Sequence, residues 1–227
     1  DGDADVTQTI AVTATSSNTS LIPNPTVTYT SDNATGSLAY TPVSNANGSA
    51  VITVTVQDNG GTANSGVDTA TRTFTVNVTA VNDEPSFTKG ADQTVLEDSG
   101  SSTITGWATS VSAGPSDESS QTLTFTVTNN NNSLFSSQPA ISSSGVLTFT
   151  PTANANGSAT VTVSLSDNGG TTNSGADDTS PNQTFTITVT AVNDAPVIDA
   201  ISDPSTILED AGAQTINLAG IADGDAD

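Results

Sequence analysis

Alternation of apolar and polar residues is the dominant pattern along this chain. Between Gln121 and Thr128, the residues Leu123, Phe125 and Val127 fall on one face of an extended strand and threonines on the other. The same alternation occupies residues 52–56, 74–78, 159–165 and 184–189. A period of two is typical of half-buried β-strands, and β-branched Val and Thr suit a pleated surface. Since no stretch keeps a helical period over three turns, the pattern predicts an all-β protein.

Internal repeats divide this alternating pattern into modules. The hexapeptide NANGSA occurs at residues 45–50 and 154–159, and TAVND occurs at 79–83 and 190–194. The copies are 109 and 111 residues apart, a common length for a β-sandwich domain. Because Asp-Gly-Asp-Ala-Asp both opens and closes the chain, we expect a section of a tandem array, with its function in length and linkage rather than in one pocket.

The repeat period and the turn residues predict one complete module at residues 83–193. Residues 1–82 are expected to hold the last five strands of a preceding module, and residues 194–227 the first two of a following one. The complete module reads as seven short strands in two antiparallel sheets, at residues 86–96, 102–107, 121–128, 138–142, 145–150, 158–166 and 183–192. The fold class is therefore predicted as tandem seven-stranded Greek-key β-sandwiches in an elongated array.

The two incomplete modules have a physical consequence. A sandwich that lacks two strands exposes unpaired edges, so residues 1–82 should be poorly stable or borrow strands from a neighbour. In the alignment of the modules Trp107 corresponds to Ile221, which favours a core position over a sugar-binding platform. Tyr40 lies in an alternating strand and is also predicted to be core.

Charge and composition exclude several classes of function. The chain has 24 acidic and two basic residues, for a net charge of −22, which excludes nucleic acid and anionic membrane surfaces as partners and favours cations. It has no His and no Cys, so Ser–His and Cys–His catalysis, disulfides and thiol chemistry are excluded. No segment approaches the ~20 apolar residues of a membrane helix. We expect no enzyme and no membrane insertion.

The acidic residues are clustered, and their spacing suits a divalent cation. Asp1, Asp3 and Asp5 alternate along the chain, and Asp223, Asp225 and Asp227 repeat the run. Calcium takes six to eight oxygen ligands, and it relieves the repulsion between neighbouring carboxylates. The alternative is that these Asp and Asn residues only form turns.

We expect the clusters to meet at the module junctions. The set expected at the second junction is Asp167, Asn193, Asp194 and Glu209, together with Asp223, Asp225 and Asp227. The set expected at the first junction is Asp58, Asn82, Asp83, Glu97, Asp117 and Glu118.

Four motifs in order carry a resemblance to a known family. They are Val-Asn-Asp followed by Pro (Val81 to Pro85, Val192 to Pro196), Leu-Glu-Asp at 96–98 and 208–210, the Asp-Gly-Asp-Ala-Asp run, and Asp-Asn-Gly-Gly before the last strand. The chain resembles the cadherin-like tandem repeats of large bacterial surface proteins and, more distantly, animal cadherin repeats. The resemblance implies cadherin-like, Ig-like sandwiches outside the cell, with Ca²⁺ bound between domains by the two acidic sets and stiffening each linker.

The chain also departs from the animal pattern. Ala80 and Ala191 stand where animal cadherins carry an acid ahead of Asn-Asp, and Asn-Ala-Asn-Gly replaces their mid-module Asp-Arg-Glu. Fewer carboxylates imply one or two ions per junction rather than three. Residues 109–118 stand in place of the Asp-x-Asp-x-Asp run, so the first junction is expected to bind more weakly.

The function predicted from these features is a structural repeat of a giant secreted bacterial surface protein, either an adhesin stalk or an extracellular fibre. Its expected partners are neighbouring modules of the same chain, other copies packed laterally through uncharged Thr, Ser and Asn faces, and a host or prey cell surface reached through a tip domain outside this sequence. The alternative is a calcium-dependent carbohydrate- or protein-binding module. That alternative needs an exposed aromatic platform, and the chain has one Trp and two Tyr.

Overall fold

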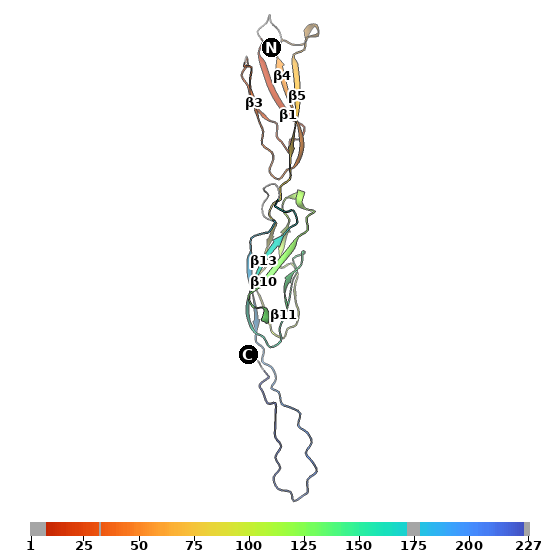
Figure 1. Ribbon diagram of the computed structural model, residues 1–227, viewed down its shortest axis with the longest axis vertical. Coiled ribbons are helices and arrows are strands. Elements are labelled where there is room, and N and C mark those ends of the chain that lie inside the picture. Colours follow the sequence, from red (N-terminus) through yellow and green to blue (C-terminus); the bar gives the residue numbers. More distant parts are fainter. Residues whose placement is uncertain (1–7, 32, 172–177, 225–227) are drawn as a thin grey trace. The chain divides into compact units, whose positions relative to one another are not determined.

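A computed structural model of the chain describes residues 8–31, 33–171 and 178–224. The contacts divide these residues into two compact units. Unit 1 contains the described residues up to Asn82, with Pro115–Glu118 and Thr171. Unit 2 contains the described residues of 83–114, 119–170 and 178–224 (Figure 1). Each unit is described by itself below.

Unit 2 contains a β-sandwich built from short strands, so the predicted all-β class is confirmed. One sheet has the order β10-β13-β14-β7, a second has the order β11-β12-β8, and β6 pairs with β9. The strands are β6 (Ser86–Thr88), β7 (Gln93–Leu96), β8 (Ser102–Ile104), β9 (Thr109–Ser112), β10 (Thr124–Asn129), β11 (Phe135–Ile141), β12 (Leu147–Pro151), β13 (Gly157–Ser166) and β14 (Gln183–Thr190). A short 3-10 turn occurs at Asn132–Leu134, and another, at Ser116–Glu118, belongs to unit 1.

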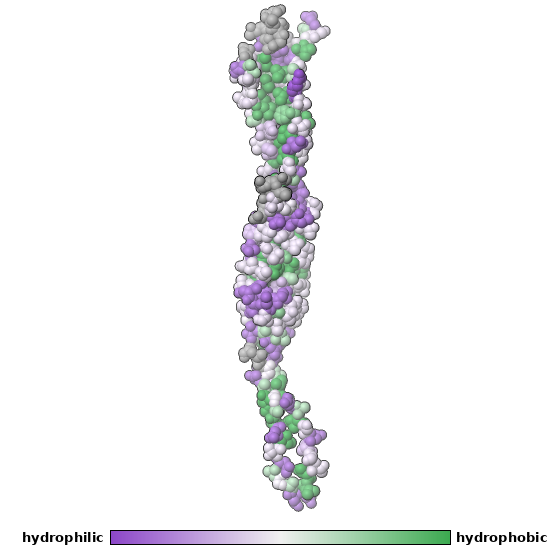
Figure 2. Space-filling view, viewed as in Figure 1, coloured by the Kyte–Doolittle hydropathy of each residue, from purple (hydrophilic) through white to green (hydrophobic). Residues whose placement is uncertain are grey.

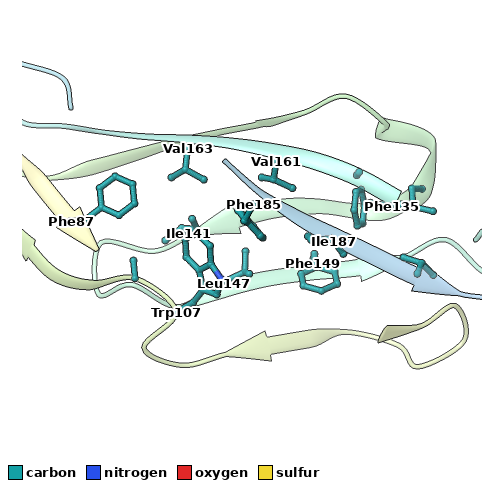
Figure 3. Packing of buried hydrophobic residues seen from close by; sticks show 14 of the residues in the cluster. Phe87, Trp107, Phe135, Ile141, Leu147, Phe149, Val161, Val163, Phe185 and Ile187 are labelled. Atoms are coloured by element: carbon teal, nitrogen blue, oxygen red, sulfur yellow. The ribbon is translucent and has the colours of Figure 1, made fainter. Parts of the chain in front are cut away.

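The core of unit 2 comes from the alternating residues of the central strands (Figure 3). Val161, Val163 and Leu165 of β13 are fully buried, as is Ile187 of β14. Trp107 is 3% exposed and packs against Phe185, with ring centroids 4.3 Å apart. Its indole Nε1 donates a hydrogen bond to the Ala91 carbonyl at 3.0 Å, which satisfies the buried polar atom. The prediction that Trp107 is a core residue is confirmed.

The first predicted strand, residues 86–96, is two strands in different sheets. β6 pairs with β9, whereas β7 runs parallel to β14, so one pairing in an otherwise antiparallel sandwich is parallel. Gly90 lies at the crossing between them, where a Cβ atom would be 2.5 Å from the Trp107 carbonyl oxygen. Only glycine allows the backbone to pass this close to Trp107. Because β7 runs parallel to β14, the residues that follow β7 lie at the same end of the sandwich as the residues that follow β14.

A second glycine of unit 2 combines a left-handed backbone with a close contact. Gly145 has φ +80°, and a Cβ atom there would lie 2.1 Å from the Ala108 carbonyl oxygen. Gly100 has a similar φ of +74° but faces open space. We expect Gly100→Ala to lower the free energy of unfolding by about 1–2 kcal/mol, the cost of the left-handed conformation alone.

Gly145→Ala should cost clearly more than Gly100→Ala, because the segment at Ala108 must also move and weaken the 3.0 Å hydrogen bond from Ala108 N to the Gly145 carbonyl. Urea unfolding followed by circular dichroism measures both variants. Equal losses would show that the contact adds nothing to the backbone strain.

Unit 1 repeats the central part of the same sandwich. Its strands are β1 (Ile10–Ser16), β2 (Thr26–Thr28), β3 (Ser37–Ala39), β4 (Gly48–Asp58) and β5 (Thr69–Val78), and a short 3-10 turn spans Ala63–Ser65. One sheet has the order β1-β4-β5, and β2 pairs with β3. The buried cluster is small: Ala14, Leu21, Ile22, Ala50 and Ile52. Tyr40, predicted to be core, is 43% exposed, so that prediction is wrong.

The described part of residues 194–224 forms no strand, although two were predicted there. The segment runs out and returns, held by a bridge between Val197 and Ala222 and by a hydrogen bond from Asp199 N to the Ala219 carbonyl (Figure 1). The outgoing and returning stretches of this segment have no third strand or sheet to pack against. They cannot bury an apolar face, so no regular ladder of hydrogen bonds forms between them. Eight apolar side chains remain between 50% and 84% exposed: Val197, Ile198, Ile201, Ile207, Leu208, Ile216, Leu218 and Ile221.

Candidate cation-binding site at the ends of the sandwich

The sandwich of unit 2 has two ends that the strand register defines. At the exit end the chain leaves β14, because Val189 pairs with Gly157, the first residue of β13. At the entry end β13 finishes and β14 begins, since Gln183 pairs with Val163 and its side-chain amide donates to the Phe87 carbonyl at 3.2 Å. Asp83 enters here, just before β6. Asp83, Glu97, Asp167, Asn193 and Asp194 can each be assigned to one of these ends.

Glu97 lies at the exit end, not at the first junction where it was predicted. In the parallel pairing of β7 with β14, Leu96 is opposite Thr190, so Glu97 follows at the point where β14 ends. Its amide donates to the Thr190 carbonyl at 3.1 Å, and its Oε1 accepts a 2.6 Å hydrogen bond from the Val192 amide. The sequence-based assignment was wrong because it assumed an antiparallel first strand.

The second carboxylate oxygen of Glu97 is unusual. Glu97 is 2% exposed, and its Oε2 is buried with no hydrogen-bond partner in the described part of the chain. Burying a charged oxygen without a donor is costly, and such atoms in folded proteins call for an explanation. A cation bound beside Oε2 would supply the missing interaction.

Three further predicted ligands lie in segments next to Glu97. Asn193 and Asp194 follow directly after Val192, and the Asn193 amide donates to the Asp194 carbonyl at 3.0 Å. Gly224, with φ +87°, passes so close to the chain that a Cβ atom would be 2.0 Å from the Ala195 carbonyl oxygen. Asp223 is therefore carried beside the Asp194–Ala195 segment. The exit end thus draws on three segments: the end of β7, the residues after β14, and the start of the Asp-Gly-Asp run.

Apart from Glu97, the candidate ligands at the exit end are at least partly exposed to solvent and spread apart. Asp194 is half-buried and Asp223 is exposed, and within the described ranges no three acidic side chains are grouped closely enough to hold a metal ion. Asp225 and Asp227, the next members of the run, lie outside the described residues, as do Asp1, Asp3 and Asp5.

Asp167 lies at the entry end, so its predicted grouping with Asn193 and Asp194 is wrong. It follows β13, which ends opposite the start of β14, and it is 8% exposed. Its Oδ1 accepts a hydrogen bond from Gly169 N at 2.9 Å, while Asn168 Oδ1 accepts one from Thr122 N at 2.8 Å. One oxygen of Asp167 therefore stabilises a turn, as expected if these Asp residues serve only to form turns.

Asp58 repeats this geometry in unit 1 and is also misplaced in the prediction. Its Oδ1 accepts a hydrogen bond from Gly60 N at 2.8 Å, and the following Asn59 Oδ1 accepts one from Thr9 N at 2.9 Å. Asp58 is opposite Ile10, at the end of β4 remote from Gly48. Gly48 pairs with Val78, which leads to Asn82, so Asp58 and Asn82 are at opposite ends of unit 1.

The remaining residues of the first set belong partly to each unit. Asn82 and Glu118 are buried polar residues of unit 1, at 8% and 5% exposed, and Asp117 is exposed in the same unit. Asp83 is half-buried and belongs to unit 2. Asp117 Oδ2 accepts a 2.7 Å hydrogen bond from the side-chain amide of Asn47. Sequence reasoning missed Asn47, because its Asn-Gly pair indicates only a turn.

Glu209 does not join Asp194 and Asp223 as predicted. It lies where the C-terminal segment turns, next to a hydrogen bond from Ala211 N to the Leu208 carbonyl, and away from the Val197–Ala222 bridge (Figure 1). Glu97 is the counterpart of Glu209 in the preceding module, and its position shows why Glu209 lies apart from Asp194. Because the Leu-Glu-Asp motif at Glu97 emerges at the exit end of its own module, the repeat predicts that Glu209 serves a later junction than the one expected.

Comparisons with known proteins agree with this architecture. Residues 82–177 match the bacterial Ig domain family. The chain is similar in structure to human protocadherin-24 EC1-2 in a crystal structure of form II, with a TM-score of 0.50, 16% sequence identity, and coverage of 79% of this chain and 82% of that chain. A comparison with curated proteins finds no match. In the described residues, no helix has the length and apolar character needed to cross a membrane. Residues 82–177 are therefore similar to bacterial Ig domains, and the resemblance of the chain to cadherin-like repeats of bacterial surface proteins is confirmed.

Proposed function

We propose that this chain is a structural repeat section of a secreted bacterial surface protein, an adhesin stalk or extracellular fibre, whose consecutive modules are joined by calcium. Bacterial Ig domains are usually extracellular or on the cell surface, and adhesion-type domains of this kind are not usually enzymes. A stalk needs many similar domains in series with linkers that do not bend freely. The repeats at residues 45–50 and 154–159 supply the series, and a bound cation would stiffen the linkers.

The observation that carries the proposal is the buried Oε2 atom of Glu97, which has no hydrogen-bond partner in the described residues. Calcium prefers carboxylate, amide and carbonyl oxygens, and a chain without His and Cys offers only these donors. The residues that would hold the ion at the exit end are Glu97, Asn193, Asp194 and Asp223, joined by Asp225 and Asp227. They come from a module, its linker and the following repeat, so one ion would tie three segments together.

For the preceding junction we propose Asn82, Asp83, Asp117, Glu118 and Asp167 as the ligands. This set keeps most of the predicted residues but exchanges Glu97 for Asp167 and releases Asp58. Its mid-module loop carries Asp117 and Glu118 in place of three aspartates. Fewer carboxylates give less electrostatic attraction for a divalent ion, so we expect this junction to bind calcium more weakly than the exit end.

Calcium should stabilise the chain, and Glu97→Gln should remove that effect. At a free calcium concentration 100 times the dissociation constant, one ion that binds only the folded state adds about 2.7 kcal/mol to the free energy of unfolding. Glu97→Gln keeps a side-chain oxygen for the Val192 amide but loses the charge. Its stability in chelator should therefore stay close to that of the wild type, while its gain in calcium is lost. Scanning calorimetry in calcium and in chelator measures both quantities.

Asp203→Asn is the matched control. It removes one negative charge from an exposed residue outside both sets and should keep the full calcium increment. If the wild-type unfolding curves are the same in calcium and in chelator, the calcium part of the proposal is wrong and only a passive spacer remains.

The alternative of a carbohydrate-binding module loses its main support. Trp107, the chain's one Trp, is 3% exposed inside the core of unit 2 and cannot serve as a platform. The exposed aromatic residues Tyr40 and Phe74 lie together in unit 1, with ring centroids 6.4 Å apart.

A further inference from the structure

The order of the strands in unit 2 determines how the unit would carry tension. Within a tandem array the unit can be pulled only through the residues that join it to its neighbours, which are Asp83 at the entry end and Asn193 at the exit end. Between these points β6 and β7 are the first strands of the unit, and β14 is the last. Tension on the chain therefore reaches β6, β7 and β14 before it reaches the strands between them.

The pairing of β7 with β14 places both strands in shear under such a load. The two strands are parallel, with Gln93 opposite Ile187 and Leu96 opposite Thr190. A pull from the entry end draws β7 back towards its own beginning, whereas a pull from the exit end draws β14 forward beyond its own end. The strands can then separate only by sliding along each other, so the evenly spaced hydrogen bonds of the parallel ladder are loaded together.

This pair of strands is packed on its inner side only. Val95 and Ile187 face the core, whereas Thr94 and Thr188, which are opposite each other, face outward. Figure 2 shows the visible face of unit 2 as mostly pale or hydrophilic, in keeping with threonines on the outer side of its strands. With apolar packing on one side alone, hydrogen bonds between the strands supply much of the resistance to sliding.

Two acidic residues extend the pairing beyond both ends of β7. Before the strand, Asp92 Oδ1 accepts a hydrogen bond from Thr186 N at 2.9 Å. After the strand, Glu97 N donates to the Thr190 carbonyl at 3.1 Å, and Glu97 Oε1 accepts from Val192 N at 2.6 Å. Hydrogen bonds to a charged acceptor are roughly twice as strong as those between neutral groups. The contact with the β14 segment therefore reaches from Thr186 to Val192, although β7 itself has only four residues.

The strand before β7 is held less regularly. β6 has three residues, and its pairing with β9 is interrupted between Ser86 and Thr88. Its partner strand contains Ser110 at φ +51°, a left-handed conformation that is unfavourable for a residue with a Cβ atom. Once β6 detaches, β7 is the segment that still joins the entry end of the chain to β14.

We propose that the parallel pair β7–β14 is the tension-bearing element of the module, and that Asp92 and Glu97 strengthen it by holding its two ends. The proposal rests on the stalk function proposed above, since only a chain under tension uses such an element. It does not need calcium, because the three hydrogen bonds at the ends of β7 form between atoms of the protein itself.

Asp92→Ala tests the proposal without disturbing the core, because Asp92 is exposed. The full chain is held by its two ends and pulled at constant force in chelator. Unit 2 should unfold roughly 2- to 10-fold faster in this variant, since the bond to Thr186 is lost before the barrier to unfolding is crossed. Asp92→Asn keeps a side-chain oxygen and should restore most of the resistance. Unit 2 is recognised by its larger gain in length, because it holds more residues than unit 1.

Asn168→Ala is the matched control. Asn168 Oδ1 accepts an exposed hydrogen bond from Thr122 N at 2.8 Å, but this bond joins the residues before β10 to the turn after β13 and lies outside the loaded pair. The two Ala variants should lower the urea midpoint by similar amounts, whereas Asn168→Ala should keep the wild-type rate of unfolding under force. Equal acceleration in the two variants, or none in Asp92→Ala, overturns the proposal.

The direction of the load gives a second test, because the chain has no cysteine and introduced pairs can set where force is applied. Handles at Glu84→Cys and Ala191→Cys load β7 and β14 in shear. Handles at Ser101→Cys and Ala191→Cys pull both strands apart from the exit end, one hydrogen bond at a time. The second pair should unfold unit 2 at a lower force in chelator, and equal forces would contradict the proposal. A missing calcium effect on stability would contradict the calcium junction but would leave both of these results unchanged.

Discussion

Replacing Trp107 by Ala should lower the free energy of unfolding of unit 2 by about 3–5 kcal/mol, the range found when a large aromatic residue is removed from a core. The indole is 3% exposed, packs on Phe185 and donates to the Ala91 carbonyl. It also fills the space against Gly90, where the first strand crosses between sheets. Its loss therefore creates a cavity at the point that holds β6 and β7 together. Urea denaturation followed by circular dichroism measures the change.

Trp107→Phe separates the two contributions of the indole. Phenylalanine retains most of the packing against Phe185 but loses the hydrogen bond to Ala91, a net loss of about 0.5–1.5 kcal/mol plus a smaller cavity. The expected order of stability is wild type, then Phe, then Ala. A Trp107→Ala protein as stable as the wild type would mean that Trp107 does not belong to the core.

The strands of unit 2 were largely predictable, because burial follows directly from alternation. Val161, Val163 and Leu165 were assigned to one face by the sequence, and all three are fully buried. Trp107 was assigned to the core by comparison of repeats, which uses the environment of one copy to infer that of another. Tyr40 was assigned to the core by alternation, and it is 43% exposed in a unit whose buried cluster is small. Alternation identifies the apolar face of a strand but not whether anything packs on it.

The direction of pairing could not be predicted, and the candidate site depends on it. A short apolar strand such as residues 93–96 fits equally well parallel or antiparallel to its neighbour. The choice is made by the crossing at Gly90, which depends on a contact with Trp107 that is distant in sequence. Because β7 is parallel to β14, Glu97 emerges at the exit end and Asp167 faces the entry end. Glu97 and Asp167 were therefore each assigned to the wrong end of the module, and their role as ligands stays a prediction.

The turn aspartates show why motif and role are hard to separate from sequence. Asp58 and Asp167 each use one oxygen to accept a hydrogen bond from the glycine two residues later, as any Asx turn does. Glu97 is different, since one oxygen accepts from Val192 and the other is buried without a partner in the described residues. Burial of the second oxygen, which sequence does not record, is what makes Glu97 the stronger candidate for a calcium ligand.

The pair Phe185→Ala and Phe74→Ala measures what the cover of a sandwich contributes, because the two residues occupy the same place in two units. Phe185→Ala should cost about 3–5 kcal/mol, since the ring is 3% exposed beneath Trp107. Phe74→Ala should cost roughly 1–2 kcal/mol in dilute protein, because a ring that is 40% exposed gains less from burial. Fluorescence of Trp107 reports the unfolding of unit 2, and circular dichroism reports both units.

The fluorescence transition should move to lower urea in Phe185→Ala and stay in place in Phe74→Ala. A cost of Phe74→Ala that matches Phe185→Ala even in dilute protein would contradict the exposure of Phe74, since it would require unit 1 to be already closed by its own residues.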